Sequence, residues 1–352
     1  MPQYIYVGVP QWTITAQGRA LGGLFRQPVG ASEWQHVVAG LPDKVEVRVI
    51  AIHPHDSQVV YAGTQYGPYR SMDGGERWER LEFPEHDGVV WTIVFHPQNP
   101  DILYLGVAPA AIYRSDNGGT SWRRLPIVAP TGAVRMSFPM RVIRLAIDPL
   151  QPQNVYAALE VGGVIRSEDG GETWRDCTPA LLTLAEQPHL KSQLGSDTDV
   201  EGMMDAHAIV VSSTQPAQVF LANRMGLFSS RDRGESWREL EIWRFSPFAY
   251  GRDIQTAPDN ARTLYAALSP AAMSQAGSIY RSQDLGETWE RFDHGVVPRR
   301  TMMAVAVSRQ DSRCVYGVNS LGQVFGTRDG GVSWAEFPLP AGLRNVYTIA
   351  CA

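Results

Sequence analysis

The chain has 352 residues, of which 44% are hydrophobic, and it carries a net charge of −5 with an isoelectric point near 5.9. This weakly acidic balance offers no broad basic field for nucleic acid, and no run of about 18 apolar residues could span a bilayer. The cysteines Cys177, Cys314 and Cys351 are sparse and odd in number, so we expect a reducing, cytoplasmic setting rather than a disulfide framework.

A short pattern ending in tryptophan recurs along the whole chain. Its core is Ser-x-Asp-x-Gly-x-x-Trp, as in residues 71–78, with Asn117 in place of Asp in one copy and Thr327 in place of Ser in another. The closing tryptophans follow one another at steps of 44 to 63 residues: Trp34, Trp78, Trp122, Trp174, Trp237, Trp289 and Trp334. Repetition at such a period indicates a repeat architecture.

The chemistry of the pattern is that of a hairpin turn between two strands. The Asp and Ser side chains accept hydrogen bonds from turn amides, and the Gly supplies a positive φ that other residues resist. The Trp then begins the returning strand and offers a large apolar surface to the core. We therefore interpret these Asp and Ser residues as structural, although they are tempting as catalytic groups.

The pattern resembles the Asp-box, or BNR, repeat of sialidases, sortilin-type receptor domains, xyloglucan-active glycosidases and photosystem II assembly factors. The resemblance covers nearly the whole chain, with five strong copies that end at Trp78, Trp174, Trp237, Trp289 and Trp334. A degenerate copy over residues 25–34 lacks the Ser and the Asp. The resemblance implies a β-propeller, and it leaves the activity open because the functions of the family differ widely.

The stretches between these turns alternate in a way that is typical of strands. Val47–Ile52 and 59–63 flank a polar turn, and Val89–Phe95 and 102–107 flank another that contains proline. Each repeat therefore has four antiparallel strands, a to d, with the Asp-box turn between c and d, which is the composition of a propeller blade. We predict an all-β fold, a single seven-bladed β-propeller that spans residues 1–352.

The two ends of the chain predict how the ring closes. Residues 4–9 resemble a strand b with no strand a before it, and residues 346–351 resemble an orphan strand a. The last strand should therefore join the first blade and leave no gap between the first and last blades.

Loop lengths indicate which face of the ring is used. The a–b and c–d turns are short throughout and define what we call the turn face, whereas the opposite, variable face carries long connections at 10–22, 126–139, 178–204, 241–251, 269–277 and 293–300. Insertions gathered on one face of a repeat fold mark its binding face. The longest, 178–204 between blades 4 and 5, should be a lid-like insertion over the central opening, with a short helix at 180–187.

Strand a of each blade should line the central channel. Alignment on the a–b turns places one residue from each blade at one level near the variable face: Arg48, Trp91, Ile143, His207, Arg252, Met303 and Tyr347. The planar fork of arginine suits carboxylate or phosphate, and an aromatic surface suits stacking on a sugar. We therefore hypothesise a substrate-binding group consisting of Arg48, Trp91, Arg141, Arg144, Arg252 and Arg300. In the alternative interpretation, the arginines pair with Glu46, Asp205 and Asp253 and only rim the channel.

His207, Asp205 and Tyr347 are the candidates for acid–base chemistry at this level. Asp205 and His207 lie two residues apart and could ligate a divalent metal, but an acidic surface segment beside a channel histidine is the favoured interpretation, and no metal or cofactor is assigned. The resemblance to sialidases implies a Tyr–Glu pair. Tyr347 or Tyr250 with Glu46 or Glu201 matches that pair only loosely, and sialidases have six blades.

Two functions follow as hypotheses. The first is a pocket on the variable face that binds a small polar ligand, anionic or sugar-like, and that acts on it as a glycosidase-like hydrolase or a lyase. The second is a non-catalytic platform that binds a protein partner, as the assembly factors of the family do. A deep polar mouth favours the first, and a broad, flat patch favours the second. Neither nucleic acid nor a membrane is an expected partner.

Overall fold

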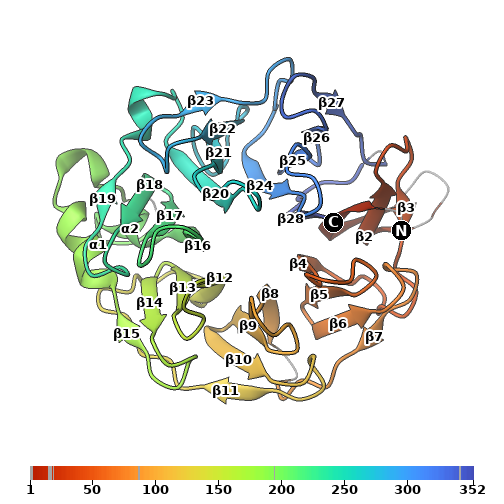
Figure 1. Ribbon diagram of the computed structural model, residues 1–352, viewed down its shortest axis with the longest axis horizontal. Coiled ribbons are helices and arrows are strands. Elements are labelled where there is room, and N and C mark those ends of the chain that lie inside the picture. The colour runs from red at the N-terminus through yellow and green to blue at the C-terminus, as the bar shows by residue number, and fades with distance from the viewer. Residues whose placement is uncertain (1–2, 15–17, 19, 86–87, 194, 341) are drawn as a thin grey trace.

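A computed structural model describes residues 3–352 except 15–17, 19, 86–87, 194 and 341. Seven four-stranded antiparallel sheets stand around a central opening, and the chain visits them in order around the ring (Figure 1). The predicted all-β, seven-bladed propeller is therefore confirmed.

Each strand position has its own environment. Strand a lines the central opening: β28 (Thr348–Cys351), β4 (Val47–Ile52), β8 (Val89–Phe95), β12 (Arg141–Ile147), β16 (Ala206–Val211), β20 (Tyr250–Thr256) and β24 (Met302–Val307). Strand b is almost wholly buried, except at the end of β1: β1 (Tyr4–Ile14), β5 (Val60–Thr64), β9 (Leu103–Ala108), β13 (Val155–Glu160), β17 (Val219–Asn223), β21 (Leu264–Ser269) and β25 (Val315–Asn319).

The outer half of each blade ends in a very short strand. Strand c is largely buried: β2 (Ala20–Pro28), β6 (Gly67–Ser71), β10 (Ala111–Ser115), β14 (Gly163–Ser167), β18 (Gly226–Ser230), β22 (Ser278–Ser282) and β26 (Val324–Thr327). Strand d forms the rim: β3 (Gln35–His36), β7 (Glu79–Arg80), β11 (Arg123–Leu125), β15 (Arg175–Asp176), β19 (Arg238–Glu239), β23 (Glu290–Arg291) and β27 (Ala335–Glu336). Such short, charged edges leave little backbone for another chain to pair with.

The C-terminal strand closes the ring. β28 pairs antiparallel with β1, with Ile5 opposite Cys351 and Gly8 opposite Thr348. Ile349 is buried in a cluster that joins blade 1 to blade 7, where it shares the core with Tyr316. The predicted closure is correct, and the strand begins at Thr348 rather than at residue 346.

The recurring turn between strands c and d is held by its own side chains. Ser71 Oγ donates to Asp73 Oδ1 at 2.7 Å, the amide of Gly75 donates to Ser71 Oγ at 2.7 Å, and the amide of Arg77 donates to Asp73 Oδ1 at 3.0 Å. The same bonds recur in the copies that begin at Ser115, Ser167, Ser230, Ser282 and Thr327. The structural interpretation of these polar residues is therefore correct.

The turns also join neighbouring blades. The hydroxyl of Tyr61 in blade 2 donates to the carbonyl oxygen of Gly118 in the turn of blade 3 at 2.9 Å. Tyr104 makes the equivalent bond to Gly170 of blade 4, also at 2.9 Å. In these places one blade holds the turn of the next by a hydrogen bond from a buried tyrosine.

Two of the predicted variable-face loops have more structure than expected. Residues 10–22 were predicted as a loop, but β1 extends to Ile14 and β2 begins at Ala20. Trp12 explains this extension, since its ring lies against Gly22 and its Nε1 donates to the carbonyl oxygen of Val45 at 2.7 Å.

The insertion 178–204 contains α1 (Thr178–Ala185), the 3-10 turn η1 (Pro188–Leu190) and α2 (Glu201–Met204), so the helix predicted at 180–187 begins earlier. Figure 1 shows α1 and α2 beside blades 4 and 5 rather than across the central opening. A further 3-10 turn, η2 (Ile242–Arg244), follows blade 5. Among the described residues, no helix is long and apolar enough to cross a membrane.

The closing contact can be tested by Ile349→Ala. Removing a buried isoleucine side chain leaves a cavity, so the free energy of unfolding should fall by about 2–4 kcal/mol in chemical denaturation. The control is Val332→Ala, since Val332 is 87% exposed, and it should change stability by less than about 0.5 kcal/mol. Equal stability of both variants would contradict closure through this contact.

The turn carboxylates predict an acid-dependent stability. Hydrogen bonds from Thr173 lower the pKa of Asp169 from 3.8 to about 2. A carboxyl whose pKa is lower in the folded state stabilises the fold above its unfolded pKa and loses that contribution as the pH falls through the folded value. The variant Asp169→Asn has the residue that Asn117 supplies at the same position of another repeat. We expect the stability of this variant to depend less on pH between 3.8 and about 2 than the stability of the parent does. Thermal unfolding across this range measures the difference, and parallel pH profiles would refute it.

Candidate functional site: the mouth of the central channel

A β-bulge occurs at the same level in strand a of six blades. In blade 2 the pairing with β5 skips Arg48 between Val47 and Val49. The corresponding extra residues are Trp91, Ile143, His207, Arg252 and Met303. A bulge leaves one residue unpaired and re-aims its side chain. Together with Tyr347, which directly precedes β28, these residues form the level that the alignment selected, and we call it the mouth.

The seven strands a enclose a cavity of about 940 Å³. All seven mouth residues line one end of it, and residues of the a–b turns, such as His53, His96 and Arg309, line the other. The channel therefore runs from the variable face to the turn face. A cavity of this volume is in the range of small-molecule sites.

At the mouth, Trp91 is covered by arginines. The guanidinium carbons of Arg48 and Arg141 lie 4.9 and 4.7 Å from the centroid of the Trp91 ring, and Tyr347 meets that ring edge-on with centroids 5.8 Å apart. Trp91 was expected to offer a stacking surface, but two guanidinium groups lie over its ring. The Nε1 of Trp91 and the Nε of Arg48 are buried without a hydrogen-bond partner among the described residues.

The carboxylates around the mouth already have arginine partners. Arg48 is paired with Glu46, and Arg141 Nη1 lies 2.8 Å from Glu160 Oε2. The pairing of Arg48 with Glu46 is one that the alternative interpretation expected.

Asp205 and His207 form a buried polar group. Arg224 donates to Asp205 Oδ2 from Nε at 2.9 Å and from Nη2 at 2.5 Å, and His207 Nε2 lies 3.3 Å from the same oxygen. Burial acts to raise the pKa of Asp205, but His207 and Arg224 outweigh it and hold that pKa well below its usual range. Asp205 is therefore an ionised partner and not a proton donor at neutral pH.

The surroundings of His207 restrict its chemistry. Its Nδ1 lies 2.7 Å from the carbonyl oxygen of Gly251, so this nitrogen carries a hydrogen, and its Nε2 lies 3.4 Å from the hydroxyl of Tyr250. Burial raises the pKa of Tyr250, which keeps this phenol protonated. Arg224 could not be found from the sequence, because it follows strand b, where no repeat pattern marks it.

Arg252 differs from the other mouth arginines. It makes no hydrogen bond or ion pair with any residue that the structure describes, although it lines the cavity. Burial acts to lower its pKa, but the nearby Tyr250, Glu160 and Asp205 outweigh this effect and raise the pKa. Since Glu160 and Asp205 contact other arginines, Arg252 remains a cation without a carboxylate in contact.

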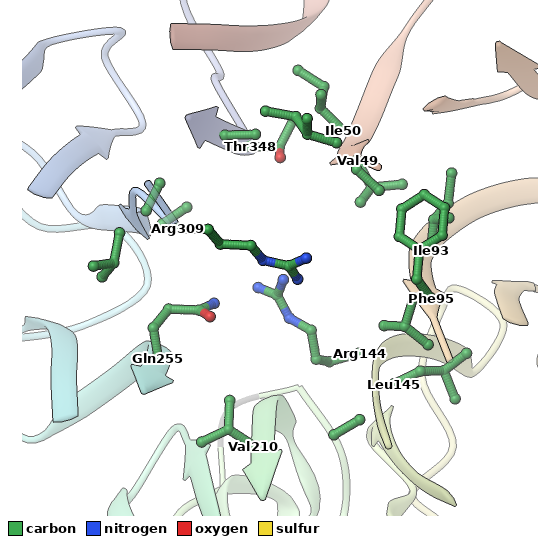
Figure 2. A pocket seen from close by; sticks show the side chains of 18 of the residues that line it. Val49, Ile50, Ile93, Phe95, Arg144, Leu145, Val210, Gln255, Arg309 and Thr348 are labelled. Carbon is green, nitrogen blue, oxygen red and sulfur yellow. The ribbon is translucent and has the colours of Figure 1, made fainter. Parts of the chain in front are cut away.

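Two predicted binding residues lie away from the mouth. Arg144 follows the bulge of blade 4, points deeper into the channel, and donates to Asp253 Oδ1 at 3.1 Å (Figure 2). Arg300 is exposed on the variable face and does not line the cavity. Its place in the sequence beside strand a suggested proximity, but Arg300 precedes β24 by two residues and lies outside the channel.

The described residues contain no group of three or more His, Cys, Asp or Glu side chains placed to hold a metal ion. At Asp205, the oxygen nearest His207 is the one that Arg224 contacts. A metal there would have to displace a guanidinium, so this pair does not fit a metal site.

The turn-face histidines act as turn caps. The Nδ1 of His53 accepts the amide of Asp56 at 3.1 Å, and the Nδ1 of His96 accepts the amide of Asn99 at 3.2 Å. Asp148 serves the same turn position in blade 4. Burial lowers the pKa of His53 and of His96, which favours the neutral ring that can accept these bonds.

Fold and channel together define a seven-bladed β-propeller whose sequence is similar to that of glycoside hydrolases. The chain is 25% identical over 328 residues to xyloglucanase Xgh74A of Acetivibrio thermocellus, a match that covers 80% of this chain and 36% of that protein. It is 23% identical over 266 residues to a xyloglucanase of Hypocrea jecorina, covering 68% of this chain and 31% of that protein. The chain thus spans about a third of the length of these relatives. No family model matches it.

Solved structures show the same fold. The GH74 xyloglucanase from Xanthomonas campestris superposes with a TM-score of 0.65 at 17% identity, covering 98% of this chain and 54% of that one. YCF48 from Cyanidioschyzon merolae superposes with a TM-score of 0.60 at 16% identity, covering 88% of this chain and 90% of that one. At these identities the likeness concerns the fold alone.

The buried Asp205–Arg224 pair predicts a stability effect. Asp205→Asn leaves Arg224 without its counter-charge in a buried site, so the free energy of unfolding at neutral pH should fall by about 3 kcal/mol. Chemical denaturation measures this loss, with Asp197→Asn in the exposed part of the insertion as the control. If the Asp205→Asn variant is as stable as the control, the Asp205–Arg224 pair does not stabilise the fold.

Proposed function

We propose that the mouth of the channel binds a carbohydrate that bears an acidic group. The observation that carries this proposal is the group of hydrogen-bond donors without acceptors at one level. Trp91, Arg48 and Arg252 line the cavity. The Nε1 of Trp91 and the Nε of Arg48 are buried without a partner, and Arg252 has no hydrogen bond or ion pair among the described residues. Buried donors without acceptors are costly, so a ligand rich in acceptor oxygens would satisfy them.

The charge balance of the mouth supports an acidic group on this ligand. Arg48, Arg141 and Arg224 are each paired with a carboxylate, whereas Arg252 is not. A single carboxylate on the ligand would neutralise the charge of Arg252, and the guanidinium fork suits the geometry of a carboxylate. Sugar hydroxyls would then accept from Trp91 and Arg48.

The sequence similarity to xyloglucanases supports the carbohydrate class. Hydrolysis of a glycosidic bond requires two carboxyl groups, one of them protonated. Asp205 is held ionised, and Glu46 and Glu160 are each paired with an arginine. His207 and Tyr347, the other acid–base candidates, would then orient the ligand. The geometry therefore favours binding over hydrolysis at the mouth.

The competing hypothesis is a platform for a protein partner. One neighbouring structure is YCF48 bound to D1 peptide, which superposes with a TM-score of 0.52 at 15% identity. A flat patch of exposed arginines would favour that function. The half-buried Arg48 and Arg252 instead line a cavity of about 940 Å³, which supports the small-ligand hypothesis.

The test is calorimetric titration of the full chain with trigalacturonate and with a neutral xyloglucan heptasaccharide. Arg252→Gln should weaken trigalacturonate binding about tenfold or more, because a charge-assisted hydrogen bond contributes about 1.5–3 kcal/mol. The neutral sugar should lose less, since it has no carboxylate for Arg252.

The matched control is Arg300→Gln, which removes an exposed arginine from the same face outside the cavity. It should leave both affinities unchanged. If Arg252→Gln binds both sugars as the parent does, the proposed site is wrong. Release of reducing ends from the heptasaccharide would show hydrolysis, which the ion-paired carboxylates do not support.

A further inference from the structure

The opposite end of the channel has a different character from the mouth. Arg309 follows β24 in the a–b turn of blade 7, and its side chain extends into the channel. Figure 2 shows the guanidinium groups of Arg309 and Arg144 facing each other at the centre, with the amide of Gln255 beside them. Three blades thus bring donor groups to one point.

The two guanidinium groups are incompletely paired. Arg309 has no hydrogen bond or ion pair with any residue that the structure describes, and the Nε of Arg144 is buried without a partner. Asp253, which lies behind Arg144, balances one of the two charges. The protein around Arg309 lowers its pKa by displacing bulk water, although its side chain still contacts the solvent of the channel. A net positive charge therefore remains at the centre.

The wall around this pair of arginines is apolar. Figure 2 shows Ile93, Phe95, Leu145 and Val210 around the guanidinium groups. Towards the turn face, half-buried apolar side chains from five blades line the cavity: Ile52, Phe95, Ile147, Val210 and Val307. These half-buried apolar side chains encircle the channel and face water, so an apolar ligand would cover them.

We propose that this end of the channel binds a small organic carboxylate with a hydrocarbon body. The carboxylate lies between Arg144 and Arg309 and accepts from both guanidinium groups, which neutralises the net charge. It also accepts from the second N–H of the Gln255 amide, whose nitrogen already donates to Asp253 Oδ1 at 3.1 Å. The hydrocarbon body covers the half-buried apolar side chains and extends toward the turn face. A monoanion matches the single uncompensated charge, and the planar carboxylate matches two arginine forks.

This site is distinct from the mouth. It uses Arg144, Arg309 and Gln255, whereas the mouth uses Arg48, Trp91 and Arg252. The two groups line opposite ends of one cavity, so a substitution at one end leaves the contacts of the other in place. Failure of one proposal is therefore distinguishable from failure of the other.

The test is calorimetric titration of the full chain with octanoate, with octanol as the neutral counterpart and with inorganic phosphate as an anion without an apolar body. Octanoate should bind, and Arg309→Gln should weaken its binding about tenfold or more. Octanol and phosphate should each bind at least about tenfold more weakly than octanoate. Arg252→Gln, at the other end, should leave octanoate binding unchanged.

The stability of the variant supplies an independent readout. Because Arg309 has no partner to lose and faces a like charge, Arg309→Gln should melt no lower than the parent without ligand. Octanoate should raise the melting temperature of the parent and not that of Arg309→Gln. Equal octanoate affinity in parent and Arg309→Gln would overturn the site. If octanol binds as tightly as octanoate, the arginine charges do not contribute to binding. If phosphate binds more tightly than octanoate, the apolar wall does not contribute.

Discussion

The antiparallel pairing of β28 with β1 is the contact on which the rest of the molecule depends. It joins the two ends of the chain, so that seven sheets share one axis and seven inner strands face one channel. Without it, blade 1 would lack its inner strand, and Tyr347 would not stand beside Trp91. The geometry of every site in the channel therefore derives from a contact between residues more than three hundred positions apart.

The turn face supplies rigidity rather than chemistry. Its Asp and Ser side chains are used within their own turns, and the turn carbonyl oxygens accept from tyrosines of the preceding blade. Turn amides and hydroxyls hold the pKa of Asp169 and of Asp329 near 2, so these carboxylates remain ionised acceptors. Carboxylates at a recurring spacing are thus a signature of the scaffold, whatever the ligand of the channel.

Inside the channel, the β-bulges divide the inner strands into two levels of different electrostatics. At the mouth, most arginines are compensated by carboxylates on neighbouring segments, and Arg252 is the exception among the described residues. Deeper in, Arg144 and Arg309 meet in an apolar surrounding, and of the carboxylates that the structure describes only Asp253 is in contact with them. The same fold can thereby present a polar, sugar-like environment at one end and an amphipathic one at the other.

The sequence by itself determined the repeat, the number of blades, the closing strand and the level of the mouth residues, because each depends on local patterns of period two and on turn chemistry. It also indicated the structural role of the carboxylates in the recurring c–d turns. It did not determine the extension of β1 to Ile14, which depends on the contact of Trp12 with residues 22 and 45. Only the tertiary structure decided which arginines are paired, since Arg224, Glu160 and Asp253 come from different blades. It also brought Arg309 to face Arg144 across three blades, and no local pattern encodes that proximity because it arises from closure of the ring.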